Sequence, residues 1–123
     1  SKTDLVPILN IDAEVTLSML SKALVAELAR LSPYGEGNPL PLFAAMNVKV
    51  VGQPRRIGSK GQHLSFYVKQ GDVAIRAVAF GRGEQFERLQ QNGKTCSLAF
   101  AIKINNWMDS ENLELEVKDI KFE

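Results

Sequence analysis

The sequence predicts a mainly β protein in which an amphipathic helix precedes five short strands that close into a barrel. Three observations support this prediction. Leucines recur at spacings of three and four between residues 17 and 31, which is the period of a helix. From residue 48 onward, apolar and polar side chains alternate in short runs, which is the period of a strand. A segment rich in Pro and Gly separates the two patterns.

Residues 1–31 are expected to form an extended arm and then the helix. The arm is Pro7–Val15, which is rich in branched residues. The apolar stripe of the helix consists of Leu17, Leu20, Leu24, Leu28 and Leu31. Such a stripe usually packs against the protein's own sheet or a neighbouring domain, and a partner-binding helix is the alternative.

Residues 32–43 are expected to form a rigid corner between helix and barrel. Pro33 fixes φ and ends the helix, and Gly35 and Gly37 permit positive φ. The Gly-x-Gly-Asn-Pro run superficially resembles a phosphate-binding loop. Such loops lead into a helix, whereas this segment leaves a helix and enters a strand, so a structural corner is favoured.

Residues 44–123 are expected to form the barrel. Strands are predicted at residues 48–51, 63–69, 73–80, 96–105 and 113–118. A basic loop, Gln53–Gln62, joins the first two strands, and the turn at Gln70, Gly71 and Asp72 makes a hairpin of the next two. A short helix, Glu84–Gln91, precedes the fourth strand. An oligonucleotide-binding (OB) barrel has five strands with a helix in this position, and closure removes exposed strand edges.

Composition indicates an ordinary globular domain. Apolar residues make up 45% of the 123 residues and charged residues 24%, and no apolar run is long enough to span a bilayer. The sequence shows no signal peptide, and the single Cys96 excludes an internal disulfide, so we expect a cytoplasmic protein and no membrane partner. The chain starts at Ser1 rather than at Met, which suggests a fragment of a larger enzyme.

No catalytic or metal-binding constellation is predicted. A metal site for phosphodiester hydrolysis normally needs several His and carboxylate ligands, and the chain has one His. Cys96 falls on the apolar side of its strand, where a buried, inert thiol is expected. We therefore expect no catalytic residue, no metal and no cofactor in this fragment.

Charge distribution points instead to binding of single-stranded nucleic acid. The net charge is only +1, but residues 48–69 contain no acid. OB barrels hold single strands with a basic groove and with aromatic rings that stack on bases. The candidate binding residues are Arg55, Arg56, Lys60, His63, Tyr67, Lys69, Arg76, Arg82 and Trp107. Ordinary surface amphipathy is the alternative for His63 and Tyr67, and a cap on one barrel end is the alternative for Trp107, which lies in an expected loop.

Several motifs carry a family resemblance. The corner residues are Leu31, Pro33, Tyr34, Gly35, Gly37, Asn38, Pro39, Pro41 and Phe43, and later matches are His63-Leu64, Ala77, Ala79-Phe80-Gly81, Asn105, Trp107, Leu113, Leu115, Val117 and Asp119-Ile120. Asp12 also fits. In these positions, over roughly residues 8 to 122, the chain resembles the OB domain of the RecJ family of single-strand-specific DNA exonucleases, in the DHH phosphoesterase superfamily.

The resemblance implies a parent enzyme that degrades single-stranded DNA from the 5′ end in repair and recombination, using Mn or Mg. The family's metal-binding motif lies in upstream phosphoesterase domains, so this fragment is expected to bind single-stranded DNA without cutting it. Implied partners are those catalytic domains and a single-strand-binding protein. Two alternatives stay open: a structural or protein-interaction OB module, and an OB domain that binds RNA.

Overall fold

The structure is a computed structural model that describes residues 11–21, 23–24, 26–27, 41–91, 95–107 and 110–122. Its side chains are described over the same ranges except at residues 105–107, 110 and 111. Residues 32–40 of the predicted corner lie outside the described residues. So do residues 1–10, which include the start of the expected arm.

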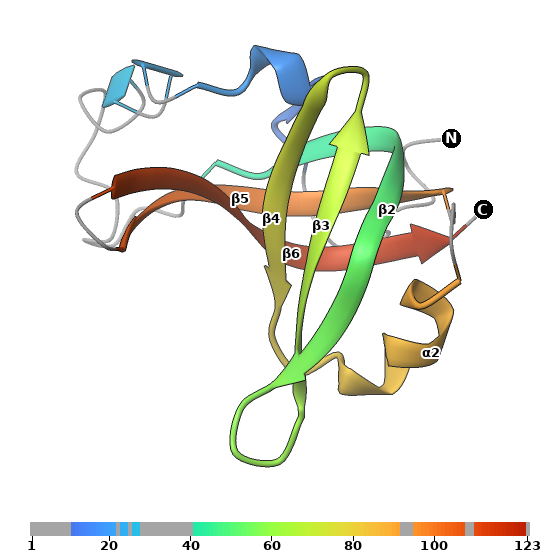
Figure 1. Ribbon diagram of the computed structural model, residues 1–123. Coiled ribbons are helices and arrows are strands. Elements are labelled where there is room, and N and C mark those ends of the chain that lie inside the picture. The colour runs from blue at the N-terminus through green and yellow to red at the C-terminus, as the bar shows by residue number, and fades with distance from the viewer. Residues whose placement is uncertain are drawn as a thin grey trace.

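Five strands close into a barrel, as predicted. They are β2 (Phe43–Ile57), β3 (His63–Gln70), β4 (Val73–Ala79), β5 (Thr95–Trp107) and β6 (Ser110–Phe122). Their order in the sheet is β2-β3-β4-β6-β5, and β2 also pairs with β5, which completes the circle. The β4–β6 pair is parallel and the other barrel pairs are antiparallel. In Figure 1, β2, β3 and β4 run steeply across β5 and β6.

Strand β2 is longer than the sequence indicated, and the expected basic loop Gln53–Gln62 is wrong in its first half. Residues 53–57 belong to β2, and only residues 58–62 connect β2 to β3. A bulge between Val51 and Arg55 lets the strand continue past Gly52, whose φ is +72°. Glycine adopts this angle without strain, and the buried Pro54 lies within the bulge, where it interrupts no regular ladder.

The barrel interior follows the alternation in the sequence. On β3, Leu64, Phe66 and Val68 are at most 1% exposed, and Phe100 on β5 is fully buried. The rings of Phe43 and Phe100 lie 6.2 Å apart between centroids. Cys96 is buried, as its place on the apolar side of its strand indicated. Alternation therefore identifies the buried face of each strand correctly.

A short helical segment fills the predicted position between the third and fourth barrel strands. It consists of the 3-10 turn η3 (Gly83–Gln85) and the helix α2 (Phe86–Leu89). It is shorter than the expected helix Glu84–Gln91. Leu89 is 1% exposed and joins the core, so α2 closes that end of the barrel (Figure 1).

The amphipathic helix expected before the barrel is only partly described. The structure has a 3-10 turn η2 (Leu17–Met19) and helical backbone at residues 23, 24, 26 and 27, while Leu28 and Leu31 lie outside the described residues. Leu17 and Leu20 are buried in the core and Leu24 packs against it. The described part of the leucine stripe thus packs on this chain's own barrel.

The N-terminal segment is also tied to the barrel by polar contacts. The short strand β1 (Ala13–Glu14) pairs in parallel with the start of β2. Gln70 accepts a hydrogen bond from the backbone N–H of Leu17 at 2.7 Å and donates one to the carbonyl of Met46 at 2.8 Å. Asp12 accepts from the N–H of Leu42 at 2.7 Å.

The β5–β6 hairpin is longer than predicted. The pairing continues to Trp107 opposite Ser110, so the expected loop from Asn106 to Asn112 is wrong at both ends. The long ladder satisfies the backbone groups that a loop would have exposed to water. The β3–β4 hairpin matches the prediction, with Gln70 paired to Val73 and Gly71 at a φ of +61° in the turn.

Candidate nucleic-acid interface

One outer face of the barrel gathers most of the predicted binding residues. We call it the cationic face and define it by the outward side chains of β2, β3 and β4. They are Lys49, Val51, Arg55, Ile57, His63, Ser65, Tyr67, Lys69, Arg76 and Val78. None of these three strands contains an Asp or a Glu. The face therefore carries positive charge that no acid within its own strands offsets.

A groove of about 460 Å³ runs along this face. Its lining residues are Gln53, Arg55, Ile57, Ser65, Phe66, Tyr67 and Arg76. Tyr67 is 52% exposed and lies directly opposite Arg76 on β4, while Arg55 lies opposite Ser65. A flat ring beside two guanidinium groups is the combination that binds a base and its phosphates.

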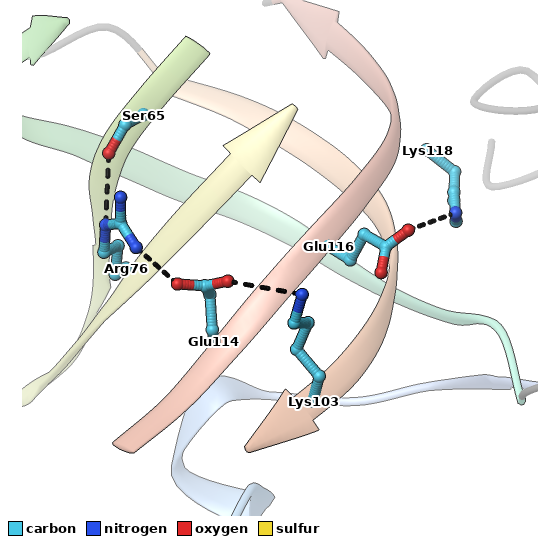
Figure 2. Close-up of polar contacts among 6 residues, drawn as sticks. All are labelled: Ser65, Arg76, Lys103, Glu114, Glu116 and Lys118. Atoms are coloured by element: carbon cyan, nitrogen blue, oxygen red, sulfur yellow. Dashed lines mark hydrogen bonds and ion pairs between the residues drawn. The ribbon is translucent and has the colours of Figure 1, made fainter. Parts of the chain in front are cut away.

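Arg76 is held in place by neighbours on both sides (Figure 2). Its Nε donates to Ser65 Oγ at 3.1 Å, and one terminal nitrogen bonds to the carboxylate of Glu114 at 2.5 Å. Glu114, on β6, is 5% exposed, and its other oxygen lies 4.0 Å from the ammonium of Lys103 on β5. These bonds fix the plane of the guanidinium beside Tyr67.

Lys69 faces another lysine, which the sequence had not singled out. Lys49 on β2 is the direct cross-strand partner of Lys69 on β3, and both side chains are exposed. Like charges opposite each other destabilise a sheet unless an anion lies between them. Only the strand register reveals this pair, because the two residues are far apart in the sequence.

Arg55 and Arg56 do not act as a pair. Arg55 lines the groove, whereas Arg56 is paired with Leu64, on the opposite side of the sheet from Ser65. The guanidinium of Arg56 lies 5.0 Å from the centre of the Phe86 ring in α2, a cation–π contact at the end of the barrel. The structure thus separates Arg56 from the groove because both arginines belong to a strand rather than to a loop.

Lys60 sits in the loop of residues 58–62, at the end of the cationic face. The loop is held by hydrogen bonds from the N–H of Gly61 to the carbonyl of Gly58 (3.2 Å) and from the N–H of Lys60 to Gln62 Oε1 (2.9 Å). Gly83 donates to the carbonyl of Gln62 at 3.0 Å, and a Cβ on Gly83 would lie 2.6 Å from the carbonyl oxygen of Gly61. The loop and η3 are therefore packed backbone to backbone.

His63 starts β3 and has a fixed orientation. Its Nδ1 accepts a hydrogen bond from the backbone N–H of Gly81 at 2.8 Å. Its ring meets the ring of Phe80 edge to face, with centroids 5.1 Å apart. Phe80 is 52% exposed, and the sequence analysis had noted it only within a family motif.

Arg82, the next candidate, is not among the described residues that line the groove. Arg82 donates to the carbonyl of Lys118 at 2.8 Å and lies 3.5 Å from the carboxylate of Asp119, both on β6. Its charge is therefore directed toward β6. Trp107 ends β5, and its side chain lies outside the described residues.

Among the described residues, no three His, Cys, Asp or Glu side chains are grouped so that they could hold a metal ion. The part of the chain that the structure covers thus does not fit the Mn or Mg that the resemblance implies for a parent enzyme. In that same part, no helix has the length and apolarity needed to cross a membrane.

The sheet order, the helix between the third and fourth barrel strands and the groove on the outer face define an OB-fold domain. A family model described as "RecJ OB domain" matches residues 11–119. The chain therefore belongs to the RecJ OB-domain family.

Individual relatives agree with this assignment. The chain is 26% identical over 119 residues to the single-stranded-DNA-specific exonuclease RecJ of Bacillus subtilis, which covers 97% of this chain and 15% of that protein. It is 43% identical over 58 residues to RecJ of Thermus thermophilus, covering 47% of this chain and 8% of that protein. The crystal structure of Thermus thermophilus RecJ in complex with Mn²⁺ superposes with a TM-score of 0.66 and 28% identity, over 92% of this chain and 16% of that one. The chain thus spans a small part of the relatives that it matches.

Proposed function

We propose that this domain binds single-stranded DNA along the cationic face and guides it toward the catalytic domains of a RecJ-like exonuclease. The observation that carries the proposal is the groove, which brings the exposed Tyr67 together with Arg55 and Arg76 on strands that contain no acid. The domain itself performs no cleavage in this proposal.

Each group in the groove has a separate role. Tyr67 stacks on one base, which is worth about 1–3 kcal/mol in single-strand binding. Arg76 and Arg55 contact phosphates next to that base. Because Ser65 and Glu114 already orient Arg76, little side-chain entropy is lost when Arg76 meets a phosphate.

Glu114 and Glu116 limit the width of the DNA path. Both are on β6, immediately beyond Arg76 and Val78 in the sheet. Both carboxylates are paired with cations, so this part of β6 attracts a phosphate backbone less than the cationic face does, and the strand runs over β2, β3 and β4.

Titration of the chain with a short oligothymidylate at several salt concentrations tests the proposal. We expect affinity to fall as salt rises, with a log–log slope of about −0.7 for each phosphate contact. Arg55→Glu and Tyr67→Ala should both weaken binding by about tenfold or more. Lys118→Glu is the matched control, because Lys118 is an exposed cation on β6 that already pairs with Glu116. Affinity that does not change with salt would contradict the proposal.

The same variants separate the alternative functions. A structural or protein-interaction module would bind DNA no differently after Arg55→Glu or Tyr67→Ala. An RNA-binding domain would prefer an oligoribonucleotide of the same sequence, since the 2′-hydroxyl is what distinguishes the two ligands.

The parent enzyme is also a proposal. We infer a longer chain that hydrolyses single-stranded DNA from the 5′ end in repair and recombination, with Mn or Mg held by residues outside this fragment. The likeness to single-stranded-DNA-specific exonucleases, and to Thermus thermophilus RecJ in complex with Mn²⁺ and with Mg²⁺, supports it. Metal added to this chain alone should neither produce cleavage nor change DNA affinity beyond the effect of ionic strength.

A further inference from the structure

We propose that Phe80, supported by His63, is a second base-stacking platform beside the cationic face, at the opposite end of β3 from Lys69. This inference rests on the proposed function and adds a second contact point for the same ligand, single-stranded nucleic acid.

Phe80 directly follows β4 and is exposed, although the end of that strand is buried. Val78 and Ala79, which precede it, are 4% and 0% exposed, whereas Phe80 is 52% exposed. Exposure of a whole aromatic ring costs hydration free energy, which a stacked base would recover.

The ring is also held in position. Leu64 is paired with Ala79, so the next residues outward, His63 and Phe80, face each other on the outer side of the sheet. Their rings are 72° apart in plane, with centroids 5.1 Å apart. His63 cannot turn freely, because Nδ1 accepts from the N–H of Gly81. A neutral imidazole that accepts at Nδ1 carries its proton on Nε2, which leaves one donor for a base or a phosphate.

The spacing of the two platforms suits a single strand. Tyr67 and His63 are four residues apart on β3 and point to the same side, so they are separated by about 13 Å. Stacked nucleotides that rise about 3.4 Å each would cover this distance in about four steps, and a stretched strand in fewer.

Cations occupy the interval between the rings. Ser65 lies midway on β3, with Arg55 opposite on β2 and the Nε of Arg76 3.1 Å from its hydroxyl. The order along the face is therefore aromatic ring, arginines, aromatic ring. It matches the alternation of bases and phosphates along a strand that lies parallel to β3. Asp119 is the next acid after Glu116 on β6, and its carboxylate forms an ion pair with Arg82.

Oligonucleotide length provides the test. With a strand of about eight nucleotides, Phe80→Ala should weaken binding by about five- to thirty-fold, and with a strand of about two nucleotides it should have no effect. Tyr67→Ala should weaken binding of both. Phe80→Leu, which keeps apolar bulk but has no π-face, should lose as much affinity as Phe80→Ala. Met19→Ala is the matched control, because Met19 is 57% exposed but lies on η2, whose Leu17 contacts Gln70 at the other end of β3.

The outcomes separate the two proposals. If Phe80→Ala behaves like Met19→Ala on the longer strand while Tyr67→Ala still weakens binding, the second platform is wrong and the proposed function stands. If Phe80→Leu binds like the unaltered chain, the contact is not stacking and the inference is also wrong. If the unaltered chain shows no salt-dependent binding, both proposals fail. Thermal unfolding of each variant confirms that the barrel is intact.

Discussion

The two outer faces of the barrel handle charge in opposite ways. On β5 and β6, described acids have cations beside them: Glu116 meets Lys118 at 2.7 Å, and Glu114 lies between Arg76 and Lys103. On β2 and β3, Lys49 faces Lys69 directly and Arg55 lies exposed opposite Ser65. The acids of β5 and β6 are thus matched by nearby cations, one of which, Arg76, belongs to the cationic face, whereas Lys49, Lys69 and Arg55 have no acid opposite them in the sheet.

This difference is what the proposed function leads one to expect. A sheet gains free energy from opposite charges across strands and loses it from like charges. The β5–β6 face follows that rule, whereas the cationic face breaks it at Lys49 and Lys69. Residues whose interactions lower stability are typically found at functional sites.

Substitutions in the hydrophobic core that β3 and β5 share should lower the free energy of unfolding to a similar extent on either strand. Phe66 on β3 and Phe100 on β5 are each at most 1% exposed, so Phe66→Ala and Phe100→Ala should each lower the free energy of unfolding by about 3–5 kcal/mol. Chemical denaturation measures both, with the milder Phe→Leu variants as controls. A much smaller loss at one site would mean that the two halves do not share one core.

Removing the carboxylate between the two faces should have the next largest effect. In Glu114→Gln, Arg76 and Lys103 lose their common counter-charge, so we expect a loss of about 1–3 kcal/mol in stability and a steeper salt dependence of DNA binding. Glu116→Gln is the control. Its side chain is 25% exposed against 7% for Glu114, so its pair with Lys118 should contribute at most about 1 kcal/mol. Equal losses of stability in Glu114→Gln and Glu116→Gln would contradict the prediction that the more buried carboxylate contributes more.

The two arginines of the groove should respond differently to lysine. Arg76→Lys keeps the charge but not the planar fork that bonds Ser65 and Glu114 together, so affinity for single-stranded DNA should fall by roughly 1 kcal/mol. Arg55→Lys should change affinity little, because Arg55 has no fixed partner among the described side chains. Fluorescence anisotropy with a labelled strand measures both. Equal effects would show that orientation of Arg76 is unimportant.

The smallest predicted effect comes from a substitution that should raise stability but weaken the electrostatic part of DNA binding. Lys69→Gln relieves repulsion from Lys49 and should raise the free energy of unfolding by about 0.2–1 kcal/mol. The same change should flatten the log–log salt slope of DNA binding by about 0.7. Lys118→Gln should not raise stability, since it removes a partner of Glu116. A stability loss in Lys69→Gln would show that the lysine pair is not strained.

Much of the barrel could be predicted from the sequence because a closed sheet depends on local alternation. Leu64, Phe66 and Val68 point inward as the period of two requires, and Gly71 forms the expected turn. The length of β2 could not be predicted. Gly and Pro normally interrupt a strand, and here a bulge at Gly52 accommodates both.

The candidate site was predicted less completely because it depends on register between strands. Tyr67 and Lys69 followed from alternation within β3, whereas the place of Arg76 on the same face depends on the register between β3 and β4. The pairs that give the face its character, Lys49 with Lys69 and Arg76 with Glu114, join residues far apart in the chain. Arg55 and Arg56 both fall in the loop expected at residues 53–62, so the sequence does not separate them, whereas adjacent residues of a strand point to opposite sides.

The close approach of Gly83 to Gly61 has a consequence for how this surface can change. Even a methyl group at Gly83 would collide with a carbonyl oxygen, and that oxygen belongs to the connection bearing Lys60. The connection and the α2 segment therefore move together or not at all, and α2 is anchored in the barrel through Leu89. A new ligand preference is therefore easier to engineer through side chains on β3 and β4. Lengthening the connection would displace α2, which closes one end of the barrel.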